Sequence, residues 1–213
     1  MGKIEQLYLL ISKEALSNSR LWLEEANHLL FERNSYGHAV SLSLFSIEEA
    51  VKSWICHTVG IGVTDRTEDV VKEVFKSHPA KMGSVIFIWM LMTNELLQKS
   101  FERKLTEEEQ AKLKEQLAVI EPHYLEDRDR LVKLRKTGMY VDNPERKPRL
   151  PREITKEEAE GFFLEAFRFY KFIKMLINIY ERANEKDKPR MLNRVNENIQ
   201  IALINWNKII SKI

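Results

Sequence analysis

The chain has little of what disulfide-rich, loop-rich or metal-binding proteins contain. Its 213 residues include one cysteine, seven glycines and six prolines. A single cysteine excludes an internal disulfide and a zinc site built from several thiolates. The histidines show neither the His-x-x-x-His nor the His-Glu-x-x-His spacing of a helical zinc site. We therefore expect no metal, and we expect no organic cofactor either.

Long apolar runs and a large charge imbalance are also missing. The formal net charge is only +2, so any basic surface must be a local patch. The most apolar window, residues 82–97, is too short to span a bilayer, and we interpret it as a buried helix. The first residues run into an amphipathic helix with acidic side chains, which a secretory signal lacks. We expect a cytoplasmic protein without a membrane partner.

The residues that are abundant favour long helices. A chain of this length, 44% apolar and 31% charged, is typical of a globular protein with a sizeable core. Leucine, glutamate, lysine, isoleucine and alanine dominate, and no segment alternates like a strand. The predicted class is all-α. We expect a helical-bundle domain over residues 1–186, with a helical extension over 187–213 packed on the same domain.

Apolar spacing and capping signals locate the helices. Ser35 is a candidate N-cap, and Thr106 and Thr155 each begin a Thr-x-x-Glu capping box. Lys188-Pro189 is expected to break the helix that Thr155 begins. The expected helices cover about residues 4–33, 36–59, 77–103, 107–119 and 122–136, then run from 155 through Tyr180 up to that break, and a last helix ends the chain.

The second of these helices is apolar around most of its circumference. One side carries Tyr36, Ala39, Val40, Ser43, Ile47, Ala50 and Trp54, and the opposite side carries His38, Leu42, Phe45, Glu49 and Cys56. Such a helix is central, packed on two sides or used in an interface. Because a single bundle covers only one side easily, we predict a homodimer.

A first group of candidate functional residues lies near the end of the helix at 122–136. Arg128 and Arg135 share one helix face, and Gly138 permits a turn that presents Tyr140 beyond the helix end. Guanidinium groups bind phosphate oxygens in a bidentate way. The alternative is that these arginines pair with neighbouring carboxylates on a solvated face, and the spacing by itself favours that alternative.

A second group opens the helix at 77–103. His78 and Lys81 lie three residues apart in its first turn. Free N–H groups and the positive end of the helix dipole favour anions at such a position. The alternative is that His78 helps to cap the helix while Lys81 extends into solvent, and this second interpretation is favoured by the local sequence.

A third group lies on the second helix. Glu49 shares its face with apolar side chains, so we expect a partly buried carboxylate that needs a partner. Lys52, one turn later, is the local candidate, and an arginine from another helix is the alternative. A core ion pair and a functional role are about equally favoured. Cys56, among apolar residues, is interpreted as a small buried hydrophobe.

Together these residues resemble the HEPN superfamily and, within it, the abortive-infection V (AbiV) group. The resemblance covers roughly residues 21–180. It rests on the order and spacing of five short patterns: Ala26-x-x-Leu29, Tyr36-x-His38-Ala39-x-x-Leu42, Ser46-x-Glu48-Glu49-x-x-Lys52, Phe75-x-x-His78-x-x-Lys81 and Leu134-Arg135-x-x-Gly138-x-Tyr140-Val141-Asp142.

The resemblance implies an up-and-down bundle of about four or five helices, usually homodimeric. Many members are metal-independent ribonucleases whose paired sites meet at the dimer interface, and many serve phage defence or toxin–antitoxin systems. The usual ribonuclease signature is an arginine followed about four to six residues later by histidine. Here Tyr140 stands where that histidine would follow Arg135. An unperturbed tyrosine, with a pKa of about 10, is a poor general base.

Two functions follow from the resemblance. In the first, the protein is a metal-independent endoribonuclease in which Arg135, Tyr140 and His78 are catalytic. The residues that bind or orient substrate are then Lys81, Glu49, Lys52 and Arg128. In the second, it is a non-catalytic dimeric module that binds a nucleotide or a partner protein in a defence or toxin–antitoxin system. A helical bundle with only a structural role is a third possibility.

Overall fold

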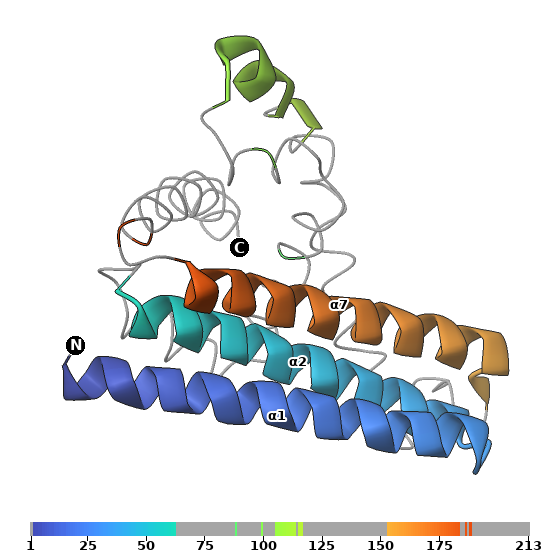
Figure 1. Ribbon diagram of the computed structural model, residues 1–213. Coiled ribbons are helices and arrows are strands. Elements are labelled where there is room, and N and C mark those ends of the chain that lie inside the picture. Colours follow the sequence, from blue (N-terminus) through green and yellow to red (C-terminus); the bar gives the residue numbers. More distant parts are fainter. Residues whose placement is uncertain are drawn as a thin grey trace, which may run out of the picture.

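Three long helices form the part of the chain that the structure describes. The structure is a computed structural model that describes residues 2–62, 88, 99, 105–113, 115–116, 153–183, 186 and 188. Helices α1 (Lys3–Phe31), α2 (Tyr36–Gly60) and α7 (Lys156–Arg182) lie side by side (Figure 1). No strand occurs among these described residues. The predicted all-α class is confirmed.

A tight turn joins α1 to α2. Asn34 adopts a left-handed conformation with φ of 51°, which asparagine tolerates better than most residues. Ser35 is the N-cap residue of α2, as predicted. Its hydroxyl oxygen lies 2.9 Å from His38 Nδ1, however, and makes no capping bond to the backbone. The position of the cap was therefore predicted correctly, while its hydrogen bond goes to a side chain.

Helix α2 lies between the other two. It runs antiparallel to α1 and parallel to α7 (Figure 1), and it contacts both along its length. Seventeen of its 25 residues are buried. The prediction of a central helix is thus confirmed. Because α1 and α7 of one chain cover two sides of α2, the apolar circumference of α2 no longer argues for a dimer.

The interface between α1 and α2 is built from small residues. The Ser12 and Ser53 hydroxyl oxygens lie 3.2 Å apart, and those of Ser19 and Ser46 lie 2.9 Å apart. The Ser46 hydroxyl also lies 2.8 Å from the Ser19 carbonyl oxygen, to which it donates. All four side chains are buried. Hydrogen bonding between the hydroxyls compensates their burial.

The interface with α7 is apolar and is formed by larger side chains. Helix α7 buries Ala159, Ala166, Phe169, Tyr170, Ile173 and Ile177. These residues belong to one cluster with buried residues of α2 such as Val40, Leu44, Ile47 and Val51. Ile88, which is helical, belongs to the same cluster. The cluster also includes Leu23 and Leu30 of α1, so all three helices contribute to the core, with most of its residues on α2 and α7.

Both predicted capping boxes are present. Thr155 Oγ1 accepts a hydrogen bond from Glu158 N, and the Glu158 carboxylate accepts one from Thr155 N. Thr106 and Glu109 form the same reciprocal pair at the start of the helical stretch 107–113. The far end of α7 differs from the prediction, because the helix ends at Arg182 and Ala183 is extended. Lys188 is itself helical, so the break comes earlier than Lys188-Pro189.

Some predicted elements fall on residues that the structure does not describe. They include most of the helix at 77–103, the whole helix at 122–136 and almost all of the extension over 187–213. Within the described helices, none is long and apolar enough to cross a membrane.

Candidate functional site

The sequence-predicted site residues divide into two sets. Glu49 and Lys52 lie on α2. The other candidates lie outside the described residues: His78, Lys81, Arg128, Arg135 and Tyr140. The structure therefore describes two of the seven candidates. We predict that Glu49 converges in space with His78, Lys81, Arg135 and Tyr140, and this stays a prediction.

Glu49 and Lys52 form an ion pair within α2. The Lys52 ammonium donates to Glu49 Oε1 across one helical turn, and the two side chains are 19% and 16% exposed, respectively. Lys52, the local candidate of the two partners considered from the sequence, thus contacts Glu49. The contact between the two opposite charges offsets part of the hydration that each side chain loses on burial.

Cys56 lies one turn beyond Lys52 on the same helix and is fully buried. Burial raises the pKa of the Cys56 thiol to about 12, the positive charge of Lys52 lowers it, and the negative charge of Glu49 raises it. The thiol is therefore protonated at neutral pH, and only a thiolate is an effective nucleophile. The prediction of a small buried hydrophobe agrees with this environment.

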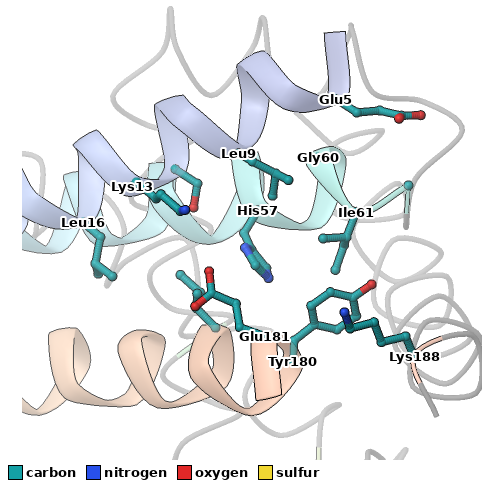
Figure 2. Close-up of a pocket in the computed structure, with 13 residues that line it drawn as sticks. Glu5, Leu9, Lys13, Leu16, His57, Gly60, Ile61, Tyr180, Glu181 and Lys188 are labelled. Carbon is teal, nitrogen blue, oxygen red and sulfur yellow. The ribbon is translucent and has the colours of Figure 1, made fainter. Parts of the chain in front are cut away.

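A cavity that the sequence analysis did not predict lies where α1 begins and where α2 and α7 end. Its volume is about 470 Å³. Figure 2 shows side chains from all three helices around it. We call it the His57 pocket. Among the described residues its lining comprises Glu5, Leu9, Ser12, Lys13, Leu16, His57, Gly60, Ile61, Gly62, Ile177, Tyr180, Glu181 and Lys188.

His57 is the buried polar group of this pocket. The residue is 3% exposed, and its ring stacks on Trp54 with centroids 6.4 Å apart. Tyr180 meets it edge-on, with centroids 5.4 Å apart and an interplanar angle of 84°. Burial, with a smaller contribution from the positive charge of Lys13, lowers the pKa of the imidazole to about 4. The imidazole is therefore neutral at pH 7.

One nitrogen of this imidazole has nothing to bond in the described structure. His57 Nε2 is buried and has no hydrogen-bond partner there. In Figure 2 the ring points from α2 toward Glu181 and Tyr180 on α7. A buried polar atom without a partner is unfavourable, and native proteins usually satisfy such atoms with protein, water or ligand.

The base of the pocket is set by a close approach of α1 and α2. A Cβ atom added at Gly60 would lie 2.6 Å from Leu9 Cγ and 3.0 Å from Leu9 N. Only glycine lets the two helices come this close without a shift of α1. Gly62, with φ of 77°, then turns the chain away in a conformation that glycine favours.

The rim of the pocket carries charges of both signs. Lys13 and Glu181 are exposed at opposite sides, on α1 and α7. No ion pair joins these two side chains. The Lys188 ammonium lies 5.8 Å from the Tyr180 ring centroid. Glu5 accepts a hydrogen bond from the backbone N–H of Gly2.

The pocket was not predicted from the sequence, because the histidines were considered only as zinc ligands. A usable signal exists in Trp54-x-x-His57-x-x-Gly60. Residues three apart are neighbours on a helix, so an indole can stack on an imidazole and a glycine can open space beside it. The residues that α7 supplies to the pocket have no comparable sequence pattern, because Tyr180 is 123 residues away from His57 in the chain.

A second hollow, of about 360 Å³, lies along α7 and is lined by Lys171, Lys174, Met175, Asn178, Ile179 and Arg182. The Lys171 ammonium lies 5.2 Å from the Phe167 ring centroid, and the Lys174 ammonium lies 5.8 Å from that of Tyr170. Cations over aromatic faces are held by the ring quadrupole. The surface is basic and partly apolar, but it offers no buried polar group.

Comparison with known proteins decides the family. The sequence profile of the HEPN family AbiV matches residues 8–168. The chain belongs to the AbiV family of HEPN proteins. No curated protein and no solved structure matches it. The family predicted from the short sequence patterns is confirmed, and it indicates an HEPN-type defence protein of the abortive-infection kind.

The AbiV match covers the two candidate sites unequally. All seven sequence-predicted site residues fall within residues 8–168. The His57 pocket is divided, because its α2 wall lies inside the match while Ile177, Tyr180, Glu181 and Lys188 lie beyond it. The family therefore bears directly on the predicted phosphate-handling residues and less directly on the pocket.

Proposed function

We propose that this AbiV-family protein is a metal-independent endoribonuclease of phage defence. The observation that carries the proposal is the family match, which spans every residue that the sequence nominates for phosphate chemistry. The basic, partly apolar surface of α7 supports it, because lysines with interleaved aromatic rings suit a nucleic-acid backbone and its bases.

The chemistry requires only groups of the protein and of the RNA. The 2′-hydroxyl oxygen attacks the adjacent phosphorus, the bond from phosphorus to the 5′ oxygen breaks, and a 2′,3′-cyclic phosphate and a 5′-hydroxyl result. His78 or Tyr140 takes the proton of the 2′-hydroxyl, and a proton is returned to the 5′ oxygen. Arg135 stabilises the charge that develops on the phosphoryl oxygens, and Lys81 assists it. Arg128 holds a neighbouring phosphate.

The Glu49–Lys52 pair has a positioning role in this proposal. Lys52 already occupies Glu49 Oε1, so the second carboxylate oxygen is the one that orients Arg135 or His78. An ion pair of this kind holds a carboxylate in one rotamer. Glu49→Gln should then reduce kcat more than it raises KM, and it should shift the acidic limb of the pH–rate profile. A purely structural pair would lower stability and leave that profile unchanged.

The experiment is an RNA cleavage assay with purified protein in excess EDTA. We expect products with 2′,3′-cyclic phosphate ends. Arg135→Ala should reduce the rate by roughly two to three orders of magnitude at nearly unchanged stability. Arg20→Ala is the matched control, because Arg20 makes only an exposed pair with Glu24 at 3.7 Å. Cleavage that survives Tyr140→Phe but is lost with His78→Ala assigns the proton transfer to His78.

The alternative is a non-catalytic module that binds a nucleotide or a partner protein. The observation that favours it is Tyr140, which replaces the usual histidine of the ribonuclease signature. In that case wild-type protein binds RNA or nucleotide without cutting it, and Arg135→Ala weakens binding. Protein that neither binds nor cuts RNA favours a protein partner, as in a toxin–antitoxin system.

We also propose that the protein is a homodimer. Large apolar side chains are exposed on α1 and near the start of α7, including Ile4, Leu7, Leu10, Leu21, Phe31 and Leu164. Burying such side chains against a second copy would remove apolar area from water. Light scattering at micromolar concentration should give about twice the monomer mass of 25.2 kDa. A species at the monomer mass alone would contradict the proposal.

A further inference from the structure

We propose that the His57 pocket binds a small amphoteric molecule of the class of free amino acids, with an ammonium and a carboxylate group on an apolar body. Three observations carry the inference: a cavity of about 470 Å³, a buried imidazole nitrogen without a partner on a ring that lines it, and the opposite charges of Lys13 and Glu181 on its two sides, which form no ion pair with one another. The proposal is independent of ribonuclease activity, which concerns other residues.

The imidazole supplies the buried contact. The His57 ring lines the pocket, stacks on Trp54 and lies nearly perpendicular to the ring of Tyr180, and its Nε2 is buried without a partner. These contacts fix the ring orientation, so the nitrogen is pre-positioned for a ligand atom. A neutral imidazole nitrogen donates or accepts one hydrogen bond according to its tautomer. It therefore suits a ligand carboxylate or a ligand N–H equally.

The rim charges determine the net charge of the ligand. Lys13 provides an ammonium group on one side of the pocket, and Glu181 provides a carboxylate on the other. A ligand with a single charge would contact only one of these two groups. A zwitterion places its carboxylate toward Lys13 on α1 and its ammonium toward Glu181 on α7, which face one another without forming an ion pair. Charge-assisted hydrogen bonds of this kind are the stronger ones.

The walls and the size determine the rest of the ligand. Leu9, Leu16, Ile61 and Ile177 line the pocket beside the charged rim, so the body of the ligand should be apolar. The volume lies in the range of about 300–1,000 Å³ that small-molecule sites occupy. An amino acid with an aliphatic or aromatic side chain meets these conditions together.

The test compares matched probes by isothermal titration calorimetry on the full chain. The zwitterions are L-leucine and L-phenylalanine. The acids without the ammonium are 4-methylpentanoate and 3-phenylpropionate, and the amines without the carboxylate are 3-methylbutylamine and 2-phenylethylamine. At least one zwitterion should bind about tenfold or more tightly than its two analogues, since each analogue loses one charged contact. No saturable binding of either zwitterion, or equal binding of an analogue, would overturn the proposal.

Variants at the exposed rim locate the site without disturbing the core. Lys13→Met should weaken binding of the zwitterion about tenfold and leave the amine unaffected. Glu181→Gln should weaken binding of the zwitterion and the amine and leave the acid unaffected. Lys174→Met, on α7 but away from this pocket, is the matched control and should bind as wild type does. Binding by Lys13→Met and Glu181→Gln that equals wild type would place the ligand elsewhere and overturn the proposal.

Nuclear magnetic resonance provides a direct readout at the imidazole. The ¹⁵N signals of the His57 ring should shift on addition of the zwitterion, while those of the exposed His38 should not. His57→Phe keeps an aromatic ring against Trp54 and removes the nitrogen, so it should reduce affinity. If that variant does not fold, the two rim variants still decide the question. Binding heat without a shift at His57 would contradict the proposed pose.

Discussion

Helix α2 packs on its two neighbours in different ways. Toward α1 it presents serines that pair with serines, and a glycine against which Leu9 lies. Toward α7 it presents large apolar residues that cluster with Phe169, Ile173 and Ile177. The first interface gains close approach and directional hydrogen bonds, which fix the register of the helices. The second gains buried apolar area, which contributes most of the favourable free energy of folding.

The largest expected effect is therefore in the apolar interface. Phe169→Ala should lower the free energy of unfolding by about 3–5 kcal/mol, because a buried ring is replaced by a cavity. Urea unfolding followed by circular dichroism measures the change. Ile173→Val is a smaller substitution in the same interface and should lower the free energy of unfolding by about 0.5–1.5 kcal/mol. A loss below 1 kcal/mol for Phe169→Ala would show that α7 is not the main apolar partner of α2.

The next largest effect is the pH dependence of stability that His57 causes at the end of α2, where α1 and α7 both contact it. Since the folded pKa of His57 is about 4, well below its ordinary value of 6.5, the unfolded chain takes up this proton first as the pH falls. The contribution of the neutral His57 imidazole to the free energy of unfolding is fully present above about pH 6.5 and is lost by about pH 4. It amounts to about 3 kcal/mol.

His57→Phe should remove this part of the pH dependence. The difference in unfolding free energy between wild type and His57→Phe, measured between pH 4 and 7, isolates it because the other titrating groups are shared. Lys13, Glu5 and Glu181 line the same pocket and are unchanged in the variant, so they are common to both proteins. A difference that does not vary with pH would mean that the imidazole is less buried than the structure indicates.

A smaller effect tests the close approach of α1 and α2. Gly60→Ala places a Cβ atom 2.6 Å from Leu9 Cγ and 3.0 Å from its backbone nitrogen, so α1 must shift. Overpacking of this kind costs about 1–3 kcal/mol. Thermal unfolding followed by circular dichroism measures it. An unchanged melting temperature would show that α1 and α2 can move apart at Gly60 without a loss of stability.

The hydroxyl pairs should contribute less than this. Ser46→Ala removes the bond to the Ser19 carbonyl oxygen and the contact with the Ser19 hydroxyl. We expect a loss of about 1–3 kcal/mol, toward the lower end because alanine fits the same space. The double variant Ser19→Ala/Ser46→Ala should cost less than the sum of the single ones, since it leaves no hydroxyl unpaired. Additive losses in chemical denaturation would contradict the pairing.

The smallest expected effect has the opposite sign. Gly161 is exposed on α7, and a Cβ atom added there would meet nothing within 4 Å. Gly161→Ala should therefore raise the free energy of unfolding by about 0.5–1 kcal/mol, from helix propensity alone. It is the matched control for Gly60→Ala, because the same substitution is made on a helix with and without a close neighbour. A loss of stability would mean that Gly161 is covered.

The helices could be predicted from sequence wherever their ends have local causes. The helix starts at Thr106 and Thr155 were predicted correctly because each threonine is followed three residues later by a glutamate. In this pattern the threonine hydroxyl accepts a hydrogen bond from the backbone N–H of the glutamate. The end of α7 at Arg182 was not recognised, since neither proline nor glycine lies beside Ala183. The packing partners of α2 were also out of reach. Periodicity shows that two sides are apolar but does not say whether α7 or a second copy covers them.

The sites follow the same division. The Glu49–Lys52 pair was predictable because both residues belong to one helix and are three positions apart. The convergence of Arg135, Tyr140, His78 and Lys81 stays a prediction, and the family match supports it without placing the side chains. The His57 pocket was not predicted because its walls come from the two ends of the chain. Such a cavity depends on how helices are offset, which no local pattern encodes.

The parallel course of α2 and α7 has a consequence for synthesis on the ribosome. Because the chain leaves α2 at Gly60 and begins α7 at Lys156, 95 residues must be translated between them. At about 5–20 residues per second this takes roughly 5–20 s. During that interval α1 and α2 have been synthesised, while the face of α2 that packs on α7 still lacks that partner. The nascent chain is therefore a candidate client for chaperones that bind exposed apolar helices.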